Sequence, residues 1–291
     1  MVLGLLGAFG AAICYGVASV FQALAARQTQ AAEGLDPRLM LRLVHSWRYL
    51  LGLALDGFAF LLSILALRSL PLFAVQAIVA SFLAITAILG AIVLRMPLRR
   101  ADKIGIGVVV AGLVLVALSA TEDRTVEADA TEVWGVLIVA IVLAGLAVPL
   151  ARLPGTVGAA SLGALAGLAY GVVAIAARIL PAPFTVVGLL TSPATYGLVV
   201  AGVLALLAYS TALQRGTVTQ VTAPLVVLET VAPALVGVIM LGDRPRPEWD
   251  WVAAIGFVLA VAGAVSLARH GELSGDDTAA VAPDEPARRA G

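Results

Sequence analysis

Two carboxyl residues, Asp56 and Glu229, lie in the middle of long apolar segments and are the first candidates for chemistry. An ionised side chain is costly in hydrocarbon, at roughly 2.5 to 3.5 kcal/mol for Asp at the centre of a membrane helix, so each is a candidate functional residue. Carboxylate oxygens are ligands for hard cations such as Mg²⁺. We predict that both residues line a substrate or cation path and are candidate metal ligands. The alternative for each is a carboxyl that is kept protonated or hydrogen-bonded for packing alone.

Prolines flank Glu229 in the sequence, at Pro224 and Pro233. Because proline has no N–H, the helix loses the hydrogen bonds to the carbonyls four residues earlier, those of Gln220 and Glu229. Such a carbonyl beside a carboxylate is a suitable oxygen ligand for a cation, and Thr222 would add a hydroxyl on the face of Glu229. We therefore predict an oxygen-lined site in this segment. A kink that only shapes the bundle would explain the prolines as well.

A third group of polar residues forms a stripe near the N-terminus, at Tyr15, Ser19 and Gln22. The spacing of i, i+4 and i+7 places all three on one face of a helix. This face is predicted to line the substrate path or, equally, to make hydrogen bonds between helices, which are common in membranes. In a later segment, Gly163, Gly167 and Gly171 recur every four residues, which predicts close helix packing.

Nine predominantly apolar segments must position these side chains. Apolar residues make up 61% of the 291 residues and charged residues only 12%, about half the ~25% of a soluble domain, which excludes a water-soluble globule. Each segment can cross a bilayer, because about 20 helical residues span ~30 Å. The sequence therefore predicts an all-α, polytopic membrane helix bundle with nine transmembrane helices. The segments are 2–26, 47–67, 71–94, 104–120, 133–151, 157–180, 193–213, 217–241 and 249–269.

Basic residues are unevenly divided between the two sides of this bundle. With nine spans, 13 of the 18 Lys and Arg residues fall on the side of the C-terminus. Because orientation follows the basic residues, the N-terminus is predicted outside and the C-terminus in the cytoplasm. Arg far outnumbers Lys and Ala is abundant, which is typical of a bacterial plasma (inner) membrane protein from a high-GC genome. The rival interpretation of residues 1–26 is a signal peptide cleaved near Ala23-Leu24-Ala25.

Short matches recur between the two halves of the chain in the same order. They pair Tyr15-Gly16-Val17 with Tyr170-Gly171-Val172, Ala66-Leu67 with Ala212-Leu213, Ile104-Gly105 with Ile255-Gly256, and Val110-Ala111-Gly112 with Val261-Ala262-Gly263. Together they relate spans 1 to 4 to spans 6 to 9. Since the offset of five spans is odd, corresponding helices cross the membrane in opposite directions, which predicts two inverted four-helix repeats joined by a connector helix.

This arrangement divides the chain into four parts. The first repeat covers 1–120, the connector with the fifth helix 121–156, the second repeat 157–269, and a disordered cytoplasmic tail 270–291. Residues 36–46 are predicted to form an interfacial helix on the cytoplasmic side, and residues 183–192 a short apolar stretch on the outer surface.

Further motifs resemble the drug/metabolite transporter (DMT) superfamily of EamA-like proteins, and within it most closely the NIPA-like magnesium transporter family. They are Trp47 with Gly52, Asp56-Gly57, Ala66-Leu67 through Pro71, Thr222-Ala223-Pro224, and Leu241-Gly242-Asp243. The last is similar to an acidic signature at a span end, with Asp instead of the more usual Glu. The first half departs from it, with Leu94-Arg95-Met96. The resemblance implies transport, of magnesium in the NIPA-like family and of metabolites in the superfamily at large.

No enzyme signature is present in the sequence. His45 and His270 are the only histidines, and neither lies at metal-ligand spacing from a cysteine or carboxylate cluster. We expect no enzyme activity, no cofactor and no nucleic-acid partner. We expect instead a transporter of a small polar solute or cation, Mg²⁺ included, that works by alternating access in contact with the lipid bilayer. A membrane scaffold or accessory subunit without transport is the alternative. The oligomeric state stays open, and a homodimer is one arrangement to test.

Overall fold

The structure is a computed structural model that describes residues 2–28, 47–93, 98–121, 128–181, 184–216 and 218–279. Within these residues the regular secondary structure is entirely helical, as predicted. The helices are α1 (Val2–Gln28), α3 (Trp47–Leu67), α4 (Leu72–Ala80), α5 (Phe82–Val93), α6 (Arg100–Ser119), α7 (Ala130–Leu150), α8 (Gly155–Arg178), α9 (Val186–Thr191), α10 (Pro193–Leu213), α11 (Val218–Ile239) and α12 (Asp250–Ala279).

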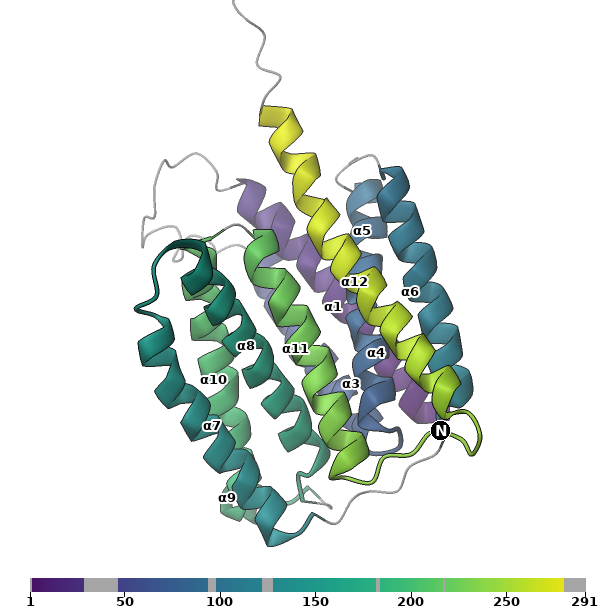
Figure 1. Ribbon diagram of the computed structural model, residues 1–291, viewed down its shortest axis with the longest axis vertical. Coiled ribbons are helices and arrows are strands. Elements are labelled where there is room, and N and C mark those ends of the chain that lie inside the picture. The colour runs from purple at the N-terminus through teal and green to yellow at the C-terminus, as the bar shows by residue number, and fades with distance from the viewer. Residues whose placement is uncertain are drawn as a thin grey trace, which may run out of the picture.

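Across the described ranges, nine segments are long and apolar enough to cross a membrane, which confirms the predicted number. Long helices run along one another in a single bundle (Figure 1). The N-terminus lies at the lower end of this bundle, and α12 extends beyond the upper end (Figure 1). The two ends of the described chain therefore lie at opposite ends of the bundle, as an odd number of crossings requires.

The third crossing differs from the continuous helix that was predicted over 71–94. It consists of α4 and α5, which meet at a turn on Ser81. The Ser81 hydroxyl donates a hydrogen bond to the Ile78 carbonyl at 2.6 Å, and the Ser81 N–H donates to the same carbonyl. A serine side chain that bonds to its own helix competes with the regular helical hydrogen bonds and bends the chain. The apolar run gave no sign of this break.

The last helix is longer than predicted. α12 continues to Ala279, ten residues beyond the expected end at Arg269, so residues 270–279 are helical although their composition predicted a disordered tail. Extending an existing helix adds one hydrogen bond per residue without a new nucleation cost, and no proline interrupts the chain before Pro283. Residues 280–291 lie outside the described residues, as does the interfacial helix predicted over 36–46. The apolar stretch at 183–192 contains the short helix α9, whose residues Val186 and Val187 are exposed.

Packing partners recur in the two halves of the chain. α1 packs against α3 and α8 packs against α10, while α1 also contacts α4 and α5 and α8 contacts α11. Between the halves, α6 packs along α12 and α4 packs along α11. α7 lies against α8 and α10, at the side of the second half.

Close approach of α8 to α11 depends on two of the predicted packing glycines. A Cβ atom on Gly163 or Gly167 would overlap the carbonyl oxygens of Val221 and Leu225 in α11. Small residues allow membrane helices to approach closely, because little else drives their association in lipid. This contact confirms the packing role predicted for the glycine stripe and fixes the position of α11, which carries Glu229.

Candidate functional site

Both predicted carboxyl residues lie near the same two tyrosines, although they come from different halves of the chain. Tyr15 of α1 is within electrostatic range of Glu229 on α11 and Asp56 on α3. Tyr170 of α8 is within range of the same two carboxyl groups and of Tyr209 on α10. We call these five residues the central polar cluster. Tyr15 and Tyr170 are the equivalent tyrosines of the two Tyr-Gly-Val matches.

All five residues of the central polar cluster are partly exposed, so the cluster is neither sealed in the core nor on an open surface. Tyr15 lies close to Ser63 of α3, whose hydroxyl donates to the Ala59 carbonyl at 3.0 Å. The Tyr15 ring also packs against the ring of Phe82 in α5, with centroids 6.2 Å apart and a tilt of 58°. These contacts hold Tyr15 in place beside the two carboxyl residues.

The backbone carbonyl of Glu229 is not available in the way that the prolines predicted. The Gln76 side chain on α4 donates a hydrogen bond from Nε2 to this carbonyl at 2.8 Å. A carbonyl left without its helical partner needs another donor in an apolar environment, and the packing of α4 along α11 brings Gln76 to it. The predicted cation ligand is therefore already a hydrogen-bond acceptor that joins the two halves.

Thr222 and Gln220 are not brought close to Glu229. α11 is continuous from Val218 to Ile239, so Thr222 and Glu229, which are seven positions apart, are separated by about 10 Å along the helix axis. One ion cannot contact both, because its ligands lie at only about 2 to 2.6 Å. The Thr222 hydroxyl is shielded from solvent and has no hydrogen-bond partner within the described part of the chain. Gln220 is exposed near the start of α11.

The remaining stripe residues of α1 do not act as one group. Ser19 donates its hydroxyl hydrogen bond to the Tyr15 carbonyl at 2.9 Å, one helical turn earlier, so this hydroxyl is used within its own helix. Gln22 lies on α1, but its side chain is outside the described residues. Of the stripe, Tyr15 is the residue that reaches the central polar cluster.

A buried ion pair at the lower end of the bundle was not predicted. Arg178 at the end of α8 contacts Asp243 with a distance of 3.2 Å between Nη2 and Oδ1, and both side chains are fully buried. Arg178 also donates to the carbonyls of Leu67, the last residue of α3, and, at 3.1 Å, of Leu70 in the turn that follows. The other oxygen of Asp243 accepts a hydrogen bond from the N–H of Leu72 at 2.5 Å.

We call this ion pair with its three backbone contacts the Arg178–Asp243 latch. It joins the second half, through α8 and the segment after α11, to the α3–α4 turn of the first half. Gly242 precedes Asp243 with φ of 73°, a conformation that glycine adopts without strain, and thereby turns the chain back towards the bundle. The sequence contained a signal for Asp243 in the Leu241-Gly242-Asp243 motif, whereas Arg178 was visible only as a basic residue at a span end.

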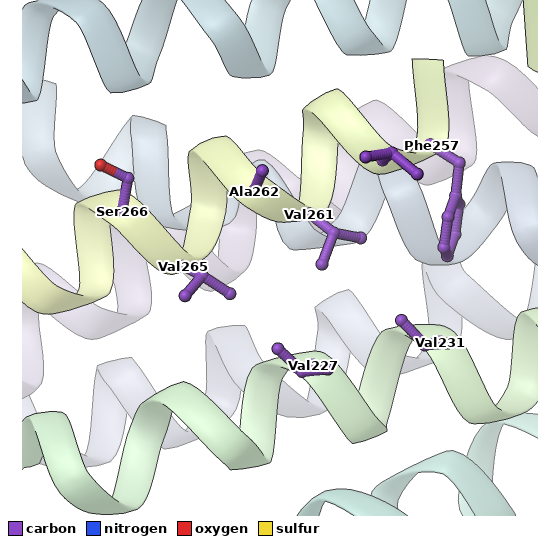
Figure 2. Close-up of a pocket in the computed structure, with 8 residues that line it drawn as sticks. Val227, Val231, Phe257, Val261, Ala262, Val265 and Ser266 are labelled. Carbon is purple, nitrogen blue, oxygen red and sulfur yellow. The ribbon is translucent and has the colours of Figure 1, made fainter. Parts of the chain in front are cut away.

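The pocket in Figure 2 lies elsewhere. It has a volume of about 450 Å³ and is lined by valines, Phe257, Ala262 and Ser266 from α11 and α12. Figure 2 shows Val261 and Val265 of α12 pointing towards α11, which carries Val227 and Val231. Glu229 lies between Val227 and Val231 in the chain and, at 100° per residue, points to the opposite side of α11. This apolar pocket does not belong to the central polar cluster.

In the described part of the chain, no three residues among His, Cys, Asp and Glu come together as a metal site. Magnesium keeps several of its waters and binds through only one or two carboxylates. The assignment of Asp56 and Glu229 as metal ligands therefore stays a prediction.

Comparisons of the chain with protein-family models, with curated proteins and with solved structures found no match. The resemblance to the drug/metabolite transporter superfamily consequently rests on the sequence motifs alone.

Proposed function

We propose that this protein is a membrane carrier that moves a small polar solute or cation by alternating access between its two halves. The observation that carries this proposal is the central polar cluster. Tyr15 and Asp56 come from the first half, and Tyr170, Tyr209 and Glu229 from the second. Carriers built from repeats bind their cargo between the repeats, and polar groups inside an apolar bundle are costly unless they serve a ligand or a network.

Reciprocal helix contacts support the inverted repeat on which alternating access depends. In the α6–α12 contact, Gly105 packs against Gly263 and Gly112 packs against Gly256. The sequence matches pair Gly105 with Gly256 and Gly112 with Gly263, so each contact is the image of the other under exchange of the halves. A two-fold axis between the halves requires such an exchange.

The orientation predicted from the basic residues supports a bundle that is closed at its outer end. The basic residues favour the C-terminal, upper end as the cytoplasmic one, so the Arg178–Asp243 latch would lie on the outer side. In this interpretation the latch holds the two halves together outside, and it separates when the carrier opens outwards. We propose that the membrane is a plasma membrane and that the N-terminus lies outside.

Two substrate classes follow from the motif resemblance. A NIPA-like protein would carry a divalent cation such as magnesium, and a protein of the wider drug/metabolite transporter superfamily would carry a polar metabolite. Since Gln76 already bonds to the Glu229 carbonyl, a cation would depend on the carboxylates of Asp56 and Glu229 and on its own waters.

Purified protein in liposomes tests this proposal. We expect uptake of Mg²⁺, followed with an indicator inside the vesicles, or of one member of a panel of polar metabolites, followed by counterflow. Empty liposomes and liposomes with a denatured sample are the controls. A folded protein that transports none of these would favour the scaffold or accessory role.

Orientation is tested separately with fusions to the C-terminus. We expect a green fluorescent protein fused after Gly291 to fluoresce and an alkaline phosphatase at the same position to stay inactive. The reverse pattern would contradict the proposed sidedness.

A further inference from the structure

Next to the Arg178–Asp243 latch, the Arg68 guanidinium lacks the partners that a buried charge needs. All three of its nitrogens are shielded from solvent and have no hydrogen-bond partner among the described residues. Arg68 lies in the turn after α3, where its backbone N–H donates to the Leu65 carbonyl at 3.2 Å. Charged donors that stay unpaired away from water are costly, so this arrangement calls for a partner beyond the described residues.

The position of the Arg68 side chain is fixed by an aromatic ring. Its guanidinium carbon lies 4.5 Å from the centroid of the Phe184 ring, before α9. The electrons of an aromatic face attract a cation that lies over it, so the Phe184 ring covers one face of the planar Arg68 guanidinium. The N–H groups at the edge of the guanidinium have no acceptor among the described residues, and their planar arrangement suits the paired oxygens of a carboxylate or phosphate.

The latch adds positive charge beside Arg68. Arg178 donates to the carbonyls of Leu67 and Leu70, on either side of the Arg68 turn. Burial first, and then the positive charge of Arg178, lower the pKa of Arg68, so the two cations act on each other. Asp243 supplies one negative charge and already accepts hydrogen bonds from Arg178 and Leu72. The three side chains together therefore carry a net charge of about +1, which favours an anion.

We propose that Arg68, with Arg178 behind it, forms a binding site for one oxyanion at the lower end of the bundle. The ligand is a phosphate or a carboxylate held by the edge of the Arg68 guanidinium. It comes either from a soluble anion or from the headgroup of an anionic lipid, because the exposed Phe184 ring lies next to the site and exposed valines follow it in the chain, in α9. The inference of this anion site does not rest on the proposed transport function.

Full-length protein in nanodiscs of phosphatidylcholine, which contributes no net negative headgroup, tests the soluble source. Inorganic phosphate or acetate is titrated against chloride at constant ionic strength, and the unfolding temperature is recorded. We expect one of the two anions to raise the unfolding temperature of the wild type. Arg68→Gln should weaken the apparent affinity by about tenfold or more, as the loss of a charge-assisted pair of hydrogen bonds predicts. Arg152→Gln, an exposed arginine in the turn after α7, is the matched control and should behave as the wild type.

Native mass spectrometry tests the lipid source on protein released from vesicles that contain phosphatidylglycerol. Retention of this lipid by the wild type and by Arg152→Gln, with loss in Arg68→Gln, would assign the site to a headgroup. If Arg68→Gln does not fold, Arg68→Lys replaces it in both experiments, because it keeps the charge but not the paired donors and should bind several-fold more weakly than the wild type. Equal binding of every probe by the wild type and the Arg68 variant, or no binding by either, would overturn the proposal.

Discussion

The centre of the bundle and its lower end both hold charged side chains, but the surroundings of these charges differ. At the lower end, Asp243 accepts from Arg178 and from the Leu72 N–H, and Arg178 reaches two backbone carbonyls as well. At the centre, Glu229 and Asp56 lie near tyrosines, which are neutral. A buried ion pair holds elements in place, whereas polar side chains that come from both halves can contact a ligand between the halves. Under the proposed function, the latch holds the two halves together and the central polar cluster serves a ligand.

Removal of one latch partner should have the largest effect on stability. Arg178→Gln leaves Asp243 buried without its cation, which should lower the free energy of unfolding by about 3 to 5 kcal/mol. Unfolding in mixed detergent and denaturant measures this loss. The double variant Arg178→Leu with Asp243→Leu should recover only part of it, because an apolar pair removes both buried charges but leaves the backbone groups of the latch without their side-chain partners. A loss below about 1 kcal/mol in the single variant would mean that the latch contributes little to holding the halves together.

A smaller effect is expected at the hydrogen bond that joins the halves beside Glu229. Gln76→Leu leaves the Glu229 carbonyl without its side-chain donor, and the loss should be about 1 to 3 kcal/mol. The same unfolding experiment measures it, and Gln214→Leu, an exposed residue after α10, is the control. An unchanged stability would indicate that water or another group replaces the Gln76 amide.

The smallest change in stability is expected for Asp56→Asn, because the amide keeps the volume of the carboxyl and hydrogen-bonding capacity. Transport should nevertheless fall, although less than for substitution of Glu229, if Asp56 contributes charge to the ligand site. Liposome uptake and unfolding are measured on the same sample. Full transport with a large loss of stability would mean that Asp56 stabilises the fold, as the latch does, and does not contribute to the ligand site.

Much of the fold could be predicted because span length and apolar composition are properties of single segments. The nine crossings and their order follow from such runs, and so does the packing role of Gly163 and Gly167. The break at Ser81 could not be predicted, because it depends on which of the few polar side chains in a largely apolar run bonds to its own helix in a way that bends the chain.

The candidate site was predictable only in part, for a different reason. Asp56, Glu229 and Tyr15 were conspicuous as polar residues in apolar segments, and the structure brings them into one cluster. Tyr170 and Tyr209 were visible in the sequence, but the place of Tyr170 within range of the carboxyl groups, and of Tyr209 within range of Tyr170, depends on how α8 and α10 pack. The pairing of Arg178 with Asp243 joins residues 65 positions apart, and the bond from Gln76 to Glu229 joins residues 153 apart. No local sequence pattern indicates a contact between residues that are so far apart in the chain.

Uptake by the Glu229→Gln protein tests the central claim most directly. The amide keeps the size of the side chain but removes its charge, so we expect transport in liposomes to be abolished while the unfolding midpoint stays close to that of the wild type. Glu248→Gln, which alters an exposed glutamate between α11 and α12, should transport as the wild type does. Wild-type rates of uptake by Glu229→Gln, measured with the substrate that the wild type carries, would contradict the assignment of Glu229 to the ligand site.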